Sequence, residues 1–156
     1  MILEAVDEDF AALIRGAPPR GLHLADGGLE TPRVLELLQR LADTVRGQFA
    51  PAAWMFVEDD EVVGLCSIKA LSGRGVIEIG YGVAPSRRNR GIGGRGVAEV
   101  LAWARLDARV SSVCAETALD NSPSRRVLER NGFETTGRRA DAAEGEVICW
   151  RRSVRS

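Results

Sequence analysis

The sequence is poor in the residues that build metal centres and disulfide scaffolds. It has a single histidine, His23, and three cysteines, Cys66, Cys114 and Cys149, which form no CxxC pair. One histidine excludes a multi-histidine metal site, and we expect no metal. Each cysteine lies in an apolar stretch, which is typical of a buried thiol in a reducing compartment, and a Cys–His nucleophile pair is disfavoured.

Long hydrophobic runs are also missing. No apolar stretch approaches the roughly 18 residues that cross a bilayer, and residues 1–7 lack the basic and long apolar segments of a secretory signal. We therefore expect a cytoplasmic protein with no membrane partner. The length of 156 residues and the 45% of apolar residues fit one domain, residues 1–156, and exclude a disordered chain.

Lysine is nearly absent, since 20 of the 21 basic residues are arginine and only Lys69 is lysine. The formal net charge of −1 lacks the basic excess of a nucleic-acid binder, and we expect no nucleic-acid partner. The charge is nevertheless uneven, because residues 1–86 hold 7 basic and 13 acidic side chains whereas residues 87–156 hold 14 and 9. We therefore expect an anionic ligand on the second half, and the acidic first half favours a cationic partner.

Turn signals and hydrophobic periodicity predict the order β-α-α-β-β-β-α-β-α-β-β, which indicates one α/β domain with a mixed sheet. Short turns join three central strands into antiparallel hairpins, and the acidic turn Glu58–Glu61 is expected to be a solvated hairpin tip rather than a metal site. Residues 17–30 are expected to be a loop. The predicted strands are Ile2–Ala5, Ala53–Val57, Val62–Leu71, Val76–Val83, Val110–Ala118, Phe133–Thr135 and Val147–Trp150, with a polar loop between the last two. The predicted helices run from the N-cap Asp7 to near Gly16, from the N-cap Thr31 to Gly47, from Gly93 to Arg109, and from Ser122 to Asn131.

A glycine-rich turn over residues 84–96 is the most informative segment of the chain. It follows a predicted strand and opens a predicted helix, so that exposed backbone N–H groups and the helix dipole attract an anion there. Four arginines, Arg87, Arg88, Arg90 and Arg95, add positive charge at the same place. The sequence therefore predicts a phosphate-bearing ligand at this turn.

Two interpretations of the turn are open. Gly91, Gly93 and Gly96 spell GxGxxG, and Glu116 lies 20 residues after Gly96, as in a dinucleotide-binding fingerprint. However, the seven residues 84–90 separate the strand from Gly91, and hairpins rather than βα units precede it. A dinucleotide-binding protein therefore remains a remote alternative.

The other interpretation starts from Arg88–Gly93, which reads Arg-x-x-Gly-x-Gly, and from a second block, Asn121–Phe133, which reads N-x-x-S-x-x-V-L-E-x-x-G-F. Together with Glu78–Tyr81, these segments resemble the GCN5-related N-acetyltransferase superfamily, closest to the RimJ/RimL-like ribosomal-protein alanine acetyltransferase branch. The resemblance covers residues 54–152 well and is vague over residues 1–50. It implies a single-domain fold with a mixed, mostly antiparallel sheet of about seven strands flanked by four helices, acetyl-CoA as co-substrate, and transfer to a primary amine of a small molecule or a protein N-terminus.

The same resemblance assigns the cofactor contacts. The backbone at the turn would bind the pyrophosphate, the strand end Tyr81–Val83 would pair with the pantetheine arm, and Asn121 would bind its amides. Gly80 and Gly82 would permit a bulge that opens the sheet. Residues 1–50 would form the acceptor side and residues 76–135 the acetyl-CoA-binding core. The expected cofactor-binding residues are Tyr81, Gly82, Val83, Arg88, Asn89, Arg90, Gly91, Ile92, Gly93, Gly94 and Asn121.

Three side chains are the candidate catalytic residues. Glu78 and Glu116 compete for the role of general base, directly or through a water relay, and we favour Glu78. Many superfamily members place a tyrosine acid where this chain has Leu128, which donates no proton, so that Ser124 is the candidate acid. A non-catalytic CoA-binding sensor is the alternative, and a homodimer is left open.

Overall fold

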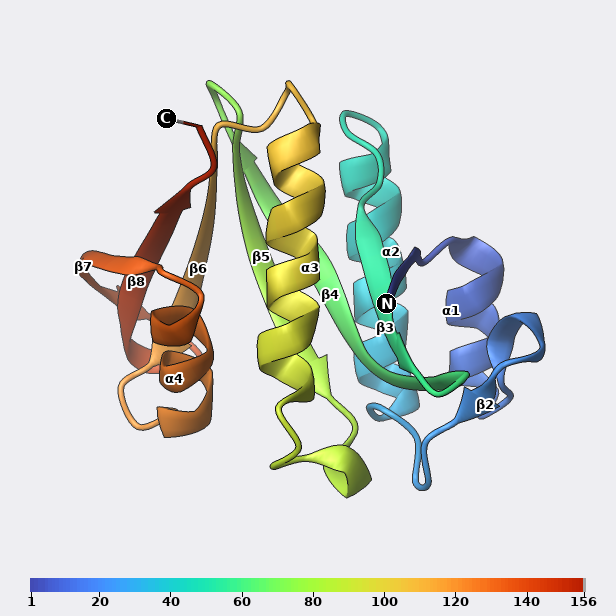
Figure 1. Ribbon diagram of the computed structural model, residues 1–156. Helices are drawn as coiled ribbons and strands as arrows, with labels where there is room; N and C mark the ends of the chain where they lie inside the picture. Colours follow the sequence, from blue (N-terminus) through green and yellow to red (C-terminus); the bar gives the residue numbers. More distant parts are fainter. Residues whose placement is uncertain (156) are drawn as a thin grey trace.

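An open, mostly antiparallel sheet runs through the computed structural model, which describes residues 1–155 (Figure 1). The strand order is β1-β3-β4-β5-β6-β8-β7, and β2 pairs with β4 beside this path. Among the strand pairs of residues 1–155, only β2–β4 and β5–β6 are parallel. The strands are β1 (Ile2–Glu4), β2 (His23–Leu24), β3 (Ala53–Glu58), β4 (Glu61–Ser72), β5 (Val76–Val83), β6 (Ser112–Ala118), β7 (Glu134–Asp141) and β8 (Gly145–Ser153).

Within the described residues, four α-helices and two 3-10 turns complete the fold. Helix α3 lies in front of the sheet in Figure 1, while α2 lies behind it. Gly96 lets α3 approach the sheet closely, since a Cβ there would lie 2.5 Å from the ring of Phe56. The third glycine of the GxGxxG pattern therefore serves helix–sheet packing. No helix within residues 1–155 is long and apolar enough to cross a membrane. The helical elements are α1 (Asp7–Ile14), η1 (Pro19–Gly21), α2 (Pro32–Arg46), η2 (Pro85–Arg87), α3 (Ile92–Leu106) and α4 (Ser122–Arg130).

The two predicted N-caps have different outcomes. The Thr31 hydroxyl accepts a hydrogen bond from the Val34 N–H, which confirms Thr31 as the cap of α2. The prediction of Asp7 is wrong, because the N-cap of α1 is Val6 and its N–H is bound by the Asp9 carboxylate at 2.9 Å. Asp9 is buried and also pairs with Arg20, so that this carboxylate joins α1 to the following turn.

Two predicted loops contain regular structure. Residues 17–30 include β2, whose His23 pairs in parallel register with Glu61 of β4, so that this segment is not a simple loop. The predicted polar loop before Val147 is mostly a long β7–β8 hairpin. Its first strand is exposed over nearly its whole length, so the sequence carries no alternating hydrophobic signal for it.

The neighbouring strands β5 and β6 are paired along only part of their length. They pair from Val76 and Ser112 to Glu78 and Cys114, and beyond that point they run on without pairing to Val83 and Ala118. Figure 1 shows the two strands moving apart toward these ends. The backbone edge of residues 79–83 that faces β6 therefore lacks a strand partner, while its other edge pairs with β4.

Candidate active site

The turn that precedes α3 forms a cradle of free backbone donors. Gly91 is the N-cap of α3 with a φ of 75°, a left-handed conformation that favours glycine, and no side chain caps the helix. Within residues 1–155, the N–H groups of Ile92, Gly93 and Gly94 have no hydrogen-bond acceptor. A Cβ on Gly94 would meet no atom within 4 Å, so the space beside these donors is open. This arrangement fits a phosphate group at a helix N-terminus.

Two ion pairs hold this turn against the β3–β4 hairpin. Arg87 donates to both carboxylate oxygens of Glu61, at 2.6 and 3.0 Å, and Arg95 donates to both oxygens of Glu58, at 2.8 and 2.9 Å. Each arginine lowers the pKa of its glutamate. The expectation of a fully solvated acidic tip is therefore wrong for Glu58 and Glu61, because the turn that follows β5 reaches back over the hairpin.

The other two arginines of the turn, Arg88 and Arg90, are exposed. Neither forms an ion pair in the part of the chain that the structure describes. Asn89 between them has a φ of 65°. The side chain of Ile92 is buried in the core, so only its backbone faces the cradle. Of the four arginines, two therefore hold the turn in place and two remain available to an anionic ligand.

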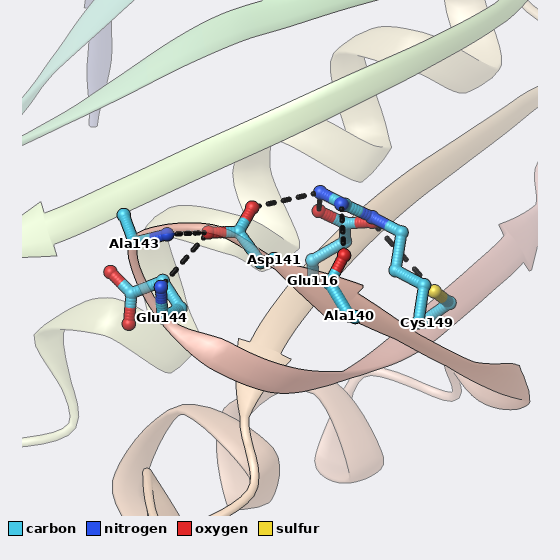
Figure 2. Close-up of polar contacts among 7 residues, drawn as sticks. Glu116, Ala140, Asp141, Ala143, Glu144 and Cys149 are labelled. Carbon is cyan, nitrogen blue, oxygen red and sulfur yellow. Dashed lines mark hydrogen bonds and ion pairs between the residues drawn. The ribbon is translucent and has the colours of Figure 1, made fainter.

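Glu116 of β6 is held by an arginine of the β7–β8 hairpin. Arg139 donates to its two carboxylate oxygens at 2.5 and 2.6 Å and also contacts Asp141 at 3.2 Å. Figure 2 shows Glu116 and Asp141 together, with the Asp141 carboxylate also accepting from the Ala143 and Glu144 N–H groups. Arg139 is the main cause that lowers the pKa of Glu116. This carboxylate is therefore kept ionised and in place.

Glu78 of β5 has the opposite surroundings. It is half-buried and has no hydrogen bond or ion pair to any residue of the described chain. Burial raises its pKa, and the nearby negative charge of Glu116 raises it further, while Lys69 and Arg139 act in the other direction. A half-buried carboxylate with a raised pKa and free oxygens is suited to accepting a proton from a bound substrate.

The glycines next to Glu78 leave space for polar side chains on its face of the sheet. A Cβ at Gly80 would lie 2.8 Å from Cδ of Lys69, and a Cβ at Gly82 would lie 4.0 Å from Oε1 of Glu30. The bulge that was expected at Gly80 and Gly82 lies instead in β4, where the register shifts between Ile68 and Ala70. Lys69 is the extra residue of this bulge.

Tyr81 and Ser124 join β5 to α4 across the region where β5 and β6 separate. The two hydroxyl oxygens lie 2.7 Å apart, and burial raises the pKa of Tyr81 to about 12. Asn121 caps α4, since its Oδ1 accepts from the Ser124 N–H at 3.2 Å. The sequence identified Tyr81 only for its backbone, and no local pattern signals a contact between residues 43 positions apart.

The remaining sequence candidates play smaller parts. Cys66 is buried as predicted, whereas Cys114 and Cys149 are only half-buried, beside the two glutamates. His23 is exposed on β2. In residues 1–155, no group of three or more His, Cys, Asp or Glu side chains is placed to hold a metal ion.

A cavity of about 550 Å³ lies between the end of α1, residues 24–30 and the start of α2. Its walls are mainly apolar, with Leu13, Leu24 and Leu35 among them, and Asp26 and Glu30 supply carboxylates. Glu30 also lies beside Gly82, so this cavity borders the end of β5.

Comparison with known proteins gives one family match and many structural matches. The family model described as "Acetyltransferase (GNAT) domain" matches residues 2–134. No curated protein sequence matches the chain.

The structural matches cover almost the whole chain at low sequence identity. An acetyltransferase from Salmonella typhimurium, which modifies the N-terminal serine of ribosomal protein L7/L12, aligns with a TM-score of 0.74 at 17% identity, covering 97% of this chain and 93% of that one. RimL, a ribosomal L7/L12 alpha-N-protein acetyltransferase in complex with coenzyme A, aligns with a TM-score of 0.70 at 18% identity, covering 97% and 92%. The aminoglycoside acetyltransferase AAC(6′)-Ib, in complex with paromomycin and acetyl-CoA, aligns with a TM-score of 0.71 at 18% identity, covering 98% and 92%.

Proposed function

The chain belongs to the GNAT acetyltransferase family, and from this premise we propose that it transfers the acetyl group of acetyl-CoA directly to a primary amine of a small molecule or a protein N-terminus. The observation that carries the proposal is the pairing of a free-donor cradle at the start of α3 with an unpaired glutamate, Glu78, at the point where β5 and β6 separate. The cradle would hold the co-substrate, and Glu78 would accept the proton of the attacking amine.

The residues around the cradle fit a pyrophosphate. The N–H groups of Ile92, Gly93 and Gly94 would donate to phosphate oxygens, and Arg88 and Arg90 would add charge. The unpaired backbone edge of Tyr81 and Val83 would hydrogen-bond the pantetheine arm in the manner of a strand, and one N–H there would polarise the thioester carbonyl. Asn121 caps α4 through its carbonyl oxygen and keeps its amide N–H₂ for the same arm.

Glu78 is the better of the two candidate bases. Its carboxylate has no competing partner, whereas Arg139 occupies both oxygens of Glu116. Glu78 would take the ammonium proton directly or through one water, and Glu116 would act at a distance by raising the pKa of Glu78.

The hydroxyl pair of Tyr81 and Ser124 would protonate the departing thiolate. Ser124 is the candidate from sequence, and its bond to Tyr81 adds a phenol, which is protonated at neutral pH and whose pKa burial raises further, to about 12. The pair compensates for Leu128, which is fully buried and supplies no proton.

The acceptor would bind on the face that carries Glu78, Gly80 and Gly82. The cavity beside Glu30 offers an apolar wall, two carboxylates and one arginine, Arg15. Its lining therefore keeps a net negative charge, and Glu30 lies beside the end of β5, which favours an amine attached to an apolar group. RimL and the aminoglycoside enzyme differ in their acceptors, so the acceptor of this chain follows from its own cavity rather than from the fold.

A thiol-release assay with acetyl-CoA tests the proposal against a panel of short peptides with free N-termini, polyamines, apolar monoamines and aminoglycosides. We expect CoA release with at least one amine, and a Glu78→Gln variant that loses it. If CoA raises the melting temperature but no amine is acetylated, the chain is a CoA-binding module rather than an enzyme.

Gly94→Ala tests the cradle without disturbing the fold, because the added methyl group enters open space. We expect acetyl-CoA to bind at least about tenfold more weakly, since the methyl group occupies the place of a phosphate oxygen. Gly73→Ala is the matched control, because its Cβ also meets nothing within 4 Å and it lies in the β4–β5 turn. Equal affinity in the two variants, measured by calorimetry, would remove the proposed phosphate site.

A further inference from the structure

A second cavity, of about 320 Å³, lies between α3, the end of α4 and β8. Three arginines from three elements line it: Arg105 of α3, Arg130 of α4 and Arg152 of β8. Ala98 and Leu101 of α3 form an apolar part of the lining. The proposed acetyl transfer uses none of these five residues.

None of the three guanidinium groups has a partner. In the described residues 1–155, Arg105, Arg130 and Arg152 take part in no ion pair and donate no side-chain hydrogen bond. The Nε of Arg152 is buried and unsatisfied. A buried donor without an acceptor is costly, so its presence calls for an acceptor that the chain does not supply.

Capping of the neighbouring helices does not explain these arginines. At the end of α4, the backbone N–H groups of residues 131–133 already bind the carbonyls of Val127, Leu128 and Glu129. At the end of α3, Arg155 binds the carbonyls of Ala104 and Arg105. These carbonyls are therefore bound by other donors, and none of the three guanidinium groups donates to a carbonyl of residues 1–155.

Gly132 makes the close approach of one arginine possible. Its φ is 77°, and a Cβ there would lie 3.3 Å from both Nε and Cζ of Arg152. The guanidinium therefore packs against the backbone where α4 ends, beside Asn131, whose Nδ2 is bound to the Gly94 and Val127 carbonyls. This packing holds Arg152 at the cavity wall.

From these contacts we infer that the arginine cavity binds a phosphate group, separately from the cradle at the start of α3. Guanidinium groups are the donors best suited to phosphate oxygens. Arg152 is held at the cavity wall, and the exposed side chains of Arg105 and Arg130 line the same cavity, so that three positive charges are available to a dianion. Along α3, Ala98 and Arg105 lie about 6 Å and about 16 Å beyond Gly94, at roughly 1.5 Å per residue. The phosphate has two chemical sources: a separate small phosphate ligand, or a further phosphate of the same CoA molecule.

Calorimetric titration with inorganic phosphate tests the inference. It is carried out in the Gly94→Ala background, so that the contribution of the cradle is reduced. We expect saturable binding of phosphate. The double variant Arg105→Gln/Arg130→Gln, in which both exposed arginines of the cavity are replaced, should bind phosphate at least about tenfold more weakly. Arg40→Gln is the matched control, since Arg40 is an exposed arginine on α2 without an ion pair, and we expect it to bind phosphate like the parent.

Two further measurements complete the test. Arg152→Gln is expected to lose phosphate binding with a melting temperature close to the parent's, and the double variant keeps the test valid if this variant fails to fold. Phosphate binding that is absent in the parent, or equal in the double variant and in Arg40→Gln, overturns the inference.

The two sources of the phosphate are then distinguished by measuring the affinities for CoA and for 3′-dephospho-CoA in the protein with an intact cradle. If the double variant binds CoA more weakly than the parent does but binds 3′-dephospho-CoA equally well, the arginine cavity holds the 3′-phosphate of CoA. Phosphate binding that persists at saturating CoA assigns it to a separate ligand. Both results support a phosphate site, and neither depends on turnover.

Discussion

The neighbouring strands β5 and β6 each carry a glutamate on the same face of the sheet, and the two carboxylates have opposite surroundings. Glu116 is bound through both oxygens by Arg139, which lowers its pKa. Glu78 is half-buried without a partner, and its pKa is raised. The difference comes from the third strand, since β8 and its hairpin partner β7 bring Arg139 to β6 and nothing equivalent reaches β5.

The separation of β5 from β6 explains why Glu78 remains free. Pairing ends at Glu78 and Cys114, so Glu78 lies at the closed end of the region where the two strands diverge. The same feature thus frees a backbone edge for a ligand and leaves the adjacent carboxylate without a neighbour. The sequence favours Glu78 without revealing the partners of either glutamate, and these partners are what distinguishes the two carboxylates in the structure.

Glu78→Gln is the substitution with the largest expected effect on the acetylation rate. We expect the acetylation rate to fall by roughly 10²–10⁴, the usual contribution of a general base, with little change in acetyl-CoA affinity. Glu116→Gln is the paired variant and is expected to lose much less. If only the Glu116 variant loses activity in the thiol-release assay, the assignment of the base is reversed.

Tyr81→Phe and Ser124→Ala test the hydroxyl pair that spans the same opening. Each is expected to lower turnover about tenfold, or about 1.4 kcal/mol in the barrier, because water partly replaces the missing acid. Acetyl-CoA affinity should change little. An additive hundredfold loss in the double variant would show that the two hydroxyls act separately rather than as one unit.

The pH dependence of kcat/KM tests whether the charge of Glu116 affects the pKa of Glu78. A base with a raised pKa is active only above that pKa, so activity should fall on acidification at a pH above the usual 4.5 of a glutamate. Removing the negative charge of Glu116 lowers the pKa of Glu78, and Glu116→Gln should move this acidic limb to lower pH. An unchanged limb would show that the two groups are not coupled.

The smallest expected effect belongs to Lys69. Its positive charge lowers the pKa of Glu78, so Lys69→Met should move the acidic limb to higher pH, by less than Glu116→Gln moves it to lower pH. Lys69→Arg keeps the charge and serves as the control. A shift of the limb to lower pH in Lys69→Met would contradict the proposed arrangement of charges around Glu78.

Local signals predicted the elements that are built from local contacts. The bounds of β5, the Thr31 cap and the start of α4 follow from strand residues, a proline at the first helical turn and an N-cap, and all three are confirmed. The phosphate cradle follows from glycine spacing in the same way, although its ligand stays a prediction.

Contacts between distant segments escaped sequence reasoning. Arg139 lies in a stretch that the polar sequence predicted as loop, so nothing suggested that it would bind Glu116, 23 residues earlier. The sequence did not predict that the Asp9 carboxylate would accept from the Val6 N–H, because Asp7 and Asp9 have the same side chain. Only the buried contact of Asp9 with Arg20 distinguishes the two. The Lys69 bulge depends on the pairing of β4 with β5, which no single strand encodes.

The two arginine–glutamate pairs that hold the turn before α3 make the cradle sensitive to ionic strength at two levels. Salt screens the attraction of Arg88 and Arg90 for a phosphate. It also weakens the pairs of Arg87 with Glu61 and of Arg95 with Glu58, and the second pair is the more exposed to solvent. Loosening these pairs lets the turn sample other conformations, and the ligand must then order it again. The affinity for a phosphate at the cradle therefore declines with salt more steeply than the charges of Arg88 and Arg90 alone dictate.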